Sequence, residues 1–156
     1  MSNTILVDTR EKKPLDLSIY GYNQKFIKLN TGDYTLEHLE DILTIERKQT
    51  CAELSMCIGK ERQRFEHELR RMAEFPYKYL LCEFPYNHLL IFPVNSTIPK
   101  KFWHKLKITS ERLIETVDNW INKYGIEFVY CENKEDAALA LLSILDNIKK
   151  ENRTVG

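Results

Sequence analysis

The pattern of apolar and polar positions predicts strands in the first third of the chain. Four short runs rich in β-branched and large apolar residues are each closed by charged or turn residues. A tight turn at Gly32-Asp33-Tyr34 leads into the third of them. We predict strands over residues 4–7, 26–29, 34 onward and 42–45, the last of them ending at Glu46.

The remainder alternates between helical and strand patterns. Apolar residues recur at four- and seven-residue intervals between residues 49 and 74, which is typical of one long amphipathic helix ending before Pro76. A second helix ends at Gly125 and a third is capped by Asn133. Buried strands are predicted over 77–83 and 126–130, and residues 84–108, with three prolines, as mostly loop with a short helix over 100–106.

This order of elements predicts an α/β fold, with a three-layer mixed β-sheet flanked by helices. The 156 residues suit one domain with a self-standing core. We expect that domain to cover residues 1–150 and residues 151–156 to form a frayed C-terminal tail.

Composition narrows the class of protein. The 23 Lys and Arg balance 23 Asp and Glu, which weighs against a non-specific polycation coating nucleic acid or membrane but leaves room for a local basic patch. The four cysteines have no zinc-knuckle or redox spacing, so we expect reduced, buried thiols. No export signal or stretch of about 20 apolar residues occurs, so we expect a cytoplasmic protein without a membrane partner.

Charged residues at the predicted strand ends carry the candidate chemistry. Asp8 and Glu11 follow the first strand, and Asp33 lies in the turn before the third. Glu46 and Lys48 are two residues apart, so on a strand both side chains leave the same face. Each residue alone is most simply a solvated side chain. Together, acids beside an amine suit a magnesium-dependent phosphodiesterase.

The reason for that pairing is the chemistry of phosphodiester hydrolysis. A cation is needed to neutralise charge on the phosphorus oxygens and to make a bound water acidic enough to attack. Mg²⁺ keeps several waters, so one or two carboxylates such as Asp33 and Glu46 suffice. Lys48 would then hold or polarise the attacking water.

Three motifs resemble the XPF-type nuclease domain, a branch of the PD-(D/E)XK superfamily. VDTRE at 7–11, GDY at 32–34 and IERK at 45–48 occur in that family's order and with similar spacing. KERQRFEHELRRM at 60–72 is similar to its arginine-rich helix, and YGIEFVYCENKEDAA is similar to its closing strand and helix. The resemblance covers most of the chain and implies a restriction-endonuclease-like fold, here as a stand-alone domain of phage or bacterial type.

The resemblance also implies roles for individual residues. Asp33 and Glu46 match the metal-binding acids, Lys48 the catalytic lysine, and Asp8 a further active-site and metal-binding carboxylate. Three further motif positions near the scissile phosphate are matched by Arg10, Glu11 and Arg47.

One position departs from the family pattern. The Asp usually found four residues after the motif lysine is Ala52, and Glu53 follows it. Glu53 either substitutes for that Asp or is a solvated helix residue, and the sequence leaves both open.

The implied function is a metal-dependent endonuclease. It would use Mg²⁺ or Mn²⁺ to hydrolyse branched, flap or junction DNA in recombination or repair, and would act as a homodimer, with an apolar surface near 84–92 as the candidate contact. The alternative is a catalytically inactive DNA-binding subunit. The family's usual helix-hairpin-helix module does not follow in this sequence, so a DNA-binding protein partner is also considered.

Two segments are candidates for DNA contact. The first contains lysines that could neutralise phosphates and an indole that could stack on a base: Lys100, Lys101, Trp103, Lys105 and Lys107. The same segment could instead be a short helix with its aromatic residues buried. Arg62 and Arg64 offer a second strip, which neighbouring glutamates dilute, so that a solvated helix face is the competing interpretation.

Overall fold

The computed structural model describes residues 2–153, and within that range six strands form one mixed sheet in the order β2-β1-β3-β4-β5-β6. β3 runs antiparallel to β1 and β4, and the other neighbouring strands pair in parallel. The strands are β1 (Thr4–Val7), β2 (Asn23–Phe26), β3 (Tyr34–Leu36), β4 (Leu43–Lys48), β5 (Tyr77–Cys82) and β6 (Glu127–Tyr130). The predicted α/β class is therefore confirmed.

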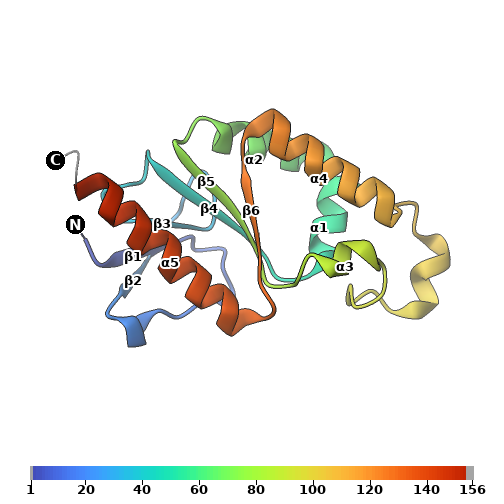
Figure 1. The fold of residues 1–156 in the computed structure, drawn as a ribbon, viewed down its shortest axis with the longest axis horizontal. Coiled ribbons are helices and arrows are strands. Elements are labelled where there is room, and N and C mark those ends of the chain that lie inside the picture. Colours follow the sequence, from blue (N-terminus) through green and yellow to red (C-terminus); the bar gives the residue numbers. More distant parts are fainter. Residues whose placement is uncertain (1, 154–156) are drawn as a thin grey trace.

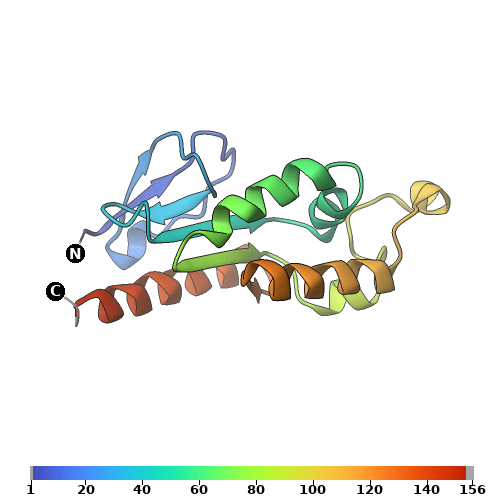
Figure 2. The ribbon, with the colours of Figure 1, turned by 90° about the horizontal axis from the view of Figure 1, so that it is seen from above.

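Helices cover both faces of this sheet, which gives the three layers. α5 packs on one face, whereas α1, α2 and α4 pack on the other; Figure 2 shows α5 and α2 on opposite sides of the strands. The helices are α1 (Cys51–Ile58), α2 (Arg62–Ala73), α3 (Asn87–Leu90), α4 (Ser110–Tyr124) and α5 (Lys134–Arg153), with 3-10 turns η1 (Ser18–Tyr20) and η2 (Lys100–Lys105) (Figure 1).

Strand alternation determines which side chains of β4 reach which layer. Leu43 and Ile45 are fully buried in the core under α5. Because side chains on a strand alternate between faces, Glu46 and Lys48 leave toward α1 and α2, and Arg47 leaves toward the other side. The same strand thus supplies a hydrophobic core and, at its end, a row of charged groups.

The predicted long helix over 49–74 is wrong, because the chain breaks at Gly59 into α1 and α2. Gly59 has φ −97° and ψ −102°, outside the helical region. A Cβ there would lie 2.8 Å from Cδ1 of Ile108, so a larger residue would collide with the segment that precedes α4. The break lets α2 turn back across the sheet and bring its first turns to the end of β4.

The boundaries of two strands also differ from the prediction. β2 spans 23–26 rather than 26–29, and the chain leaves the sheet after Ile27, whose N–H donates to the Val7 carbonyl. β4 continues through Glu46 to Lys48 instead of ending at Glu46. The segment 84–108 is mostly loop as predicted, with α3 as an additional turn of helix and η2 in place of the short helix.

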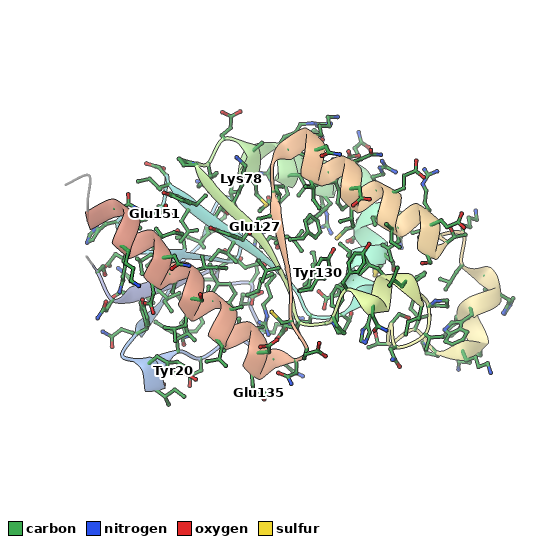
Figure 3. The ribbon with its side chains drawn as sticks, in the orientation of Figure 1. Tyr20, Lys78, Glu127, Tyr130, Glu135 and Glu151 are labelled. Carbon is green, nitrogen blue, oxygen red and sulfur yellow. The ribbon has the colours of Figure 1, made fainter. Side chains whose placement is uncertain are left out.

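The C-terminal elements follow the predicted signals. Gly125 ends α4 with φ 68°, and the Asn133 side chain accepts a hydrogen bond from the Asp136 N–H at 2.8 Å. Figure 3 shows Glu127 and Tyr130 on β6, between α5 and α4. The helical pattern was expected to fray after residue 150, but α5 runs on to Arg153, and residues 154–156 of the predicted tail lie outside the described residues. No helix in the described part of the chain has the length and apolar character that crossing a membrane requires.

Candidate active site

A polar cleft opens where β3 and β4 diverge. The two strands pair through Tyr34 and Ile45, and β4 continues beyond that pair while α2 lies across the gap. The cleft has a volume of about 370 Å³ and is lined by Arg10, Glu11, Gly32, Asp33, Glu46, Arg47, Lys48, Glu53, Arg64, Phe65, Glu68 and Arg71. The structure therefore brings Asp33, Glu46 and Lys48 together, although they come from two separate motifs.

Backbone geometry places the Asp33 carboxylate at the floor of this cleft. Its N–H donates to the Ile45 carbonyl at 2.7 Å, and its Oδ2 accepts from the Arg47 N–H at 2.8 Å. The Asp33 carboxylate thus accepts the hydrogen bond of the Arg47 N–H in place of a backbone carbonyl of the neighbouring strand. Gly32 is required before it, because its φ is 76° and a Cβ would lie 2.3 Å from the Thr44 hydroxyl oxygen.

Glu46 and Lys48 both line the cleft, and the pKa of each is raised. Glu46 is only 9% exposed, and burial first, then the neighbouring Asp33 carboxylate, raise its pKa well above the ordinary value. Burial alone would lower the pKa of Lys48, but the charges of Glu46 and Asp33 outweigh it and the pKa is raised. The carboxylates therefore hold the lysine protonated, while burial and the Asp33 carboxylate oppose ionisation of Glu46.

The close approach of the Asp33 and Glu46 carboxylates suits a divalent cation. Among the described residues, no group of three or more His, Cys, Asp or Glu side chains encloses a metal site. Mg²⁺ does not need such an enclosure, because it keeps several water ligands and binds through one or two carboxylates. Asp33 and Glu46 supply that pair, and a cation beside them would relieve the repulsion that raises the pKa of Glu46.

Asp8 lies outside the cleft lining, and its role as a metal ligand stays a prediction. It is fully buried; its Oδ1 accepts from the Leu29 N–H at 2.9 Å, and its Oδ2 accepts from the backbone and side-chain N–H groups of Arg10. Burial alone would raise the pKa of Asp8, but these hydrogen bonds lower it. Asp8 therefore anchors the 27–29 segment and orients Arg10 at the edge of the cleft.

The Arg47 side chain lies on the opposite face of β4, away from the expected scissile phosphate. It is 1% exposed, pairs with Glu83 through Nε and Nη2, and donates from Nη1 to Glu11 at 2.8 Å and to the Lys13 carbonyl at 2.6 Å. The Tyr34 hydroxyl donates to the same Glu11 carboxylate. Arg47 thus holds the loop that carries Glu11 in place. Part of the Arg47 side chain also lines the cleft.

The structure separates the two alternatives for Glu53. Its side chain lines the cleft and is half-buried; burial raises its pKa, although the charge of Lys48 acts in the opposite direction. The position is fixed by the start of α1, where the Glu53 N–H donates to the Thr50 hydroxyl at 3.2 Å. Glu53 is therefore a residue of the cleft wall, one position after Ala52.

Helix α2 supplies three cleft residues that sequence reasoning did not assign to the site. Glu68 accepts from the Gly32 N–H at 2.7 Å and also pairs with Arg71, while Phe65 forms an apolar wall. A signal was present, because positions 64, 68 and 71 lie on one face of a helix. This signal is ambiguous in the sequence alone, because the charges of this helix also fit a solvated helix face.

The predicted DNA-contact residues fall in different places. Arg64 lies at the cleft mouth with its side chain 79% exposed, whereas Arg62 pairs with Glu66 in a separate hollow against α4. The η2 segment projects from the end of the molecule beyond α1 and α4 (Figures 1 and 2). Its exposed lysines are Lys100, Lys101, Lys105 and the following Lys107.

Two further predictions concern aromatic and apolar side chains. Trp103 is half-buried and its Nε1–H donates to the Ile98 carbonyl at 2.9 Å, whereas Phe102 is 43% exposed, so the aromatic residues of this segment are not both packed. The expected dimer surface at 84–92 is mixed. Its buried members are Phe84, Leu89 and Phe92, and its exposed apolar members are Tyr86, Leu90 and Ile91.

Comparison with known proteins gives a fold. No protein-family model matches the chain, and no curated protein matches it. XPF from Aeropyrum pernix, in complex with DNA, matches with a TM-score of 0.69 at 20% identity, over 95% of this chain and 66% of that chain. A second structure of XPF from Aeropyrum pernix matches with a TM-score of 0.65 at 20% identity, over 90% of this chain and 58% of the other.

This chain thus spans less than two thirds of the length of either XPF chain. The similarity nevertheless extends over nearly all of its own residues. The chain therefore has the XPF-type fold that its sequence motifs predicted.

Proposed function

We propose that this chain is a metal-dependent endonuclease that hydrolyses phosphodiester bonds of branched, flap or junction DNA. The observation that carries the proposal is the convergence of Asp33, Glu46 and Lys48 in one cleft, where the two carboxylates lie close enough to raise the pKa of Glu46. The similarity in fold to an XPF solved in complex with DNA supports DNA as the substrate. Recombination or repair is the process we propose for such an activity.

Each of the three cleft residues has a separate role in the proposed hydrolysis. Asp33 and Glu46 would hold Mg²⁺ or Mn²⁺, which would supply neutralisation of charge on the phosphate and a more acidic water. Lys48 donates a hydrogen bond to the attacking water and holds it in line with phosphorus. As that water attacks, the P–O3′ bond breaks, leaving a 5′-phosphate and a 3′-hydroxyl.

Three arginines at the cleft mouth are suited to bind the phosphates on either side of the scissile bond. Arg10, Arg64 and Arg71 each keep more than half of the side chain exposed while pairing with one acid. An arginine held this way is already oriented and still has free donors for phosphate oxygens. These contacts are electrostatic and independent of base sequence, so binding through them weakens as salt rises.

The test is cleavage of flap, junction, duplex and single-stranded DNA with Mg²⁺ or Mn²⁺ and with EDTA. We expect cleavage with either metal and none with EDTA, and Lys48→Ala and Asp33→Asn each to lower the rate by about 100-fold or more. The matched controls are Lys25→Ala and Asp118→Asn, which alter exposed residues of β2 and α4 and should keep the wild-type rate. Undiminished cleavage in both site variants would refute the assignment.

The second candidate function is an inactive DNA-binding subunit. The observation in its favour is the alanine at position 52, where the family pattern has an acid. Under this alternative the same assay would show binding of DNA without cleavage in any metal. The position of Glu53 in the cleft wall favours the active enzyme.

A further inference from the structure

The ammonium of Lys48 lies over an aromatic face. Its Nζ is 4.8 Å from the centroid of the Phe65 ring, within the range of a cation–π contact. Phe65 comes from α2, is 7% exposed and forms part of the cleft wall. No catalytic function of a phenyl ring explains its place in a cleft otherwise lined by charged side chains and one glycine.

The ring is itself held in place from behind. Its centroid is 5.3 Å from that of Trp120, with the planes tilted by 54°, and Trp120 of α4 is 1% exposed. The side chain of Cys57 in α1, itself 3% exposed, is also a neighbour of Lys48 and contributes to raising the pKa of the lysine. Three helices therefore contribute to one lysine: α1 through the thiol, α2 through the ring and α4 through the indole behind the ring.

The chemistry of the contact explains why an aromatic residue suits this place. A carboxylate there would accept N–H bonds from Lys48 and compete with water for its donors. A ring face attracts the positive charge without accepting a strong hydrogen bond. It therefore fixes the ammonium while leaving N–H groups for the cleft. It also adds no negative charge to a site where carboxylates already repel one another.

We infer that Phe65 is a positioning residue for Lys48, holding its ammonium over the ring face so that it points into the cleft. The kinetic consequence rests on the proposed function, because it requires Lys48 to act in hydrolysis. The placement of Lys48 can be measured without activity.

The kinetic test compares Phe65→Leu, which removes the π face but keeps an apolar side chain, with Phe65→Tyr, which keeps the face. We expect Phe65→Leu to lower single-turnover kcat by about 3- to 30-fold with KM changed less than about twofold, since a cation–π contact contributes about 0.5–2 kcal/mol. Phe65→Tyr should recover most of the rate. Leu69→Val, in the same core cluster, is the control for lost stability alone.

Equal loss of kcat in Phe65→Leu and Leu69→Val at equal loss of Tm would overturn the inference, as would an unchanged kcat in Phe65→Leu. The second readout is NMR of the Lys48 methylene protons next to Nζ, assigned by their disappearance in Lys48→Met. We expect them upfield of other lysines because of the ring current, and at the ordinary position in Phe65→Leu. An ordinary shift in the wild type overturns the inference, whereas a shielded lysine in a protein that cleaves no DNA contradicts only the proposed function.

Discussion

The two faces of β4 handle charge in opposite ways. On one face, the Arg47 guanidinium has partners on every side, from Glu83, Glu11 and the Lys13 carbonyl. On the other face, Glu46 crowds the Asp33 carboxylate, and the Lys48 ammonium lies beside both acids. Consecutive residues of one strand therefore build a satisfied network and an unsatisfied one.

This difference separates structural from functional charge. A buried ion network with all its hydrogen bonds made holds loops in place and has nothing left to offer a ligand. A site whose acids are short of positive charge is destabilising in isolation, and it becomes favourable only when a cation binds. Glu46, Arg47 and Lys48 are all buried or half-buried. Only Glu46 and Lys48, which share one face, lack the complete set of partners that Arg47 has.

Removing the central cation of the satisfied face should have the largest effect. In Arg47→Met, the buried Glu83 carboxylate loses its side-chain partner and Glu11 keeps only the Tyr34 hydroxyl, so we expect the free energy of unfolding to fall by about 3–5 kcal/mol, measured by urea denaturation. Arg64→Met, which removes an exposed arginine, should change it by less than about 0.5 kcal/mol. A loss below about 1 kcal/mol in Arg47→Met would show that the network contributes little.

Removing a charge from the unsatisfied face should stabilise the protein. We expect Glu46→Gln to raise the free energy of unfolding of the metal-free protein by on the order of 1–2 kcal/mol while abolishing cleavage. Because the folded pKa of Glu46 is raised, its ionisation opposes folding as pH rises above the ordinary value of 4.5 and through the folded pKa. The advantage of Glu46→Gln over the wild type should therefore grow with pH across that window.

The same pair of proteins tests the cation. Saturating Mg²⁺ or Mn²⁺ at 100 times Kd should stabilise the wild type by about 2.7 kcal/mol, and should stabilise Glu46→Gln much less. Thermal melts with and without metal measure both. Equal stabilisation of the two proteins would place the cation elsewhere.

The smallest expected effect concerns the contact between α2 and the turn that carries Asp33. Glu68→Ala removes the acceptor of the Gly32 N–H, and we expect a loss of about 1 kcal/mol in the free energy of unfolding together with slower cleavage. Glu115→Ala, which alters an exposed residue of α4 outside the cleft lining, should cost about 0–0.5 kcal/mol and leave cleavage unchanged. Indistinguishable cleavage rates in these two variants would mean that Glu68 does not position Asp33.

The sequence predicted those parts of the site that local patterns determine. The order of strands and helices gave the fold, and the two-residue spacing placed Glu46 and Lys48 on one face. What it could not give were long-range partners: Glu83, directly after β5, is 36 residues from Arg47, and Glu68 on α2 is 36 residues from Gly32. Nothing in the local pattern assigns a charged residue to a distant acid.

Asp8 and Gly59 show two further limits. A motif match gave Asp8 a metal-binding role, but its hydrogen bonds to Leu29 and Arg10 depend on how residues 27–29 leave the sheet. Gly59 was visible as a helix-weakening residue. The apolar pattern continues on both sides of it, and the close approach of the Ile108 side chain, which favours glycine at this position, is visible only in the folded chain.

In the hairpin formed by β3 and β4, the cleft lies at one end and the loop that connects the two strands lies at the other. The strands are antiparallel, so the Asp33 end of the hairpin faces the cleft while the connecting loop over residues 37–42 lies at the far end. Insertions or deletions in that loop would leave the spacing of Asp33 and Glu46 unchanged. The loop is therefore the natural place to graft a tag, an epitope or a second binding module onto this chain.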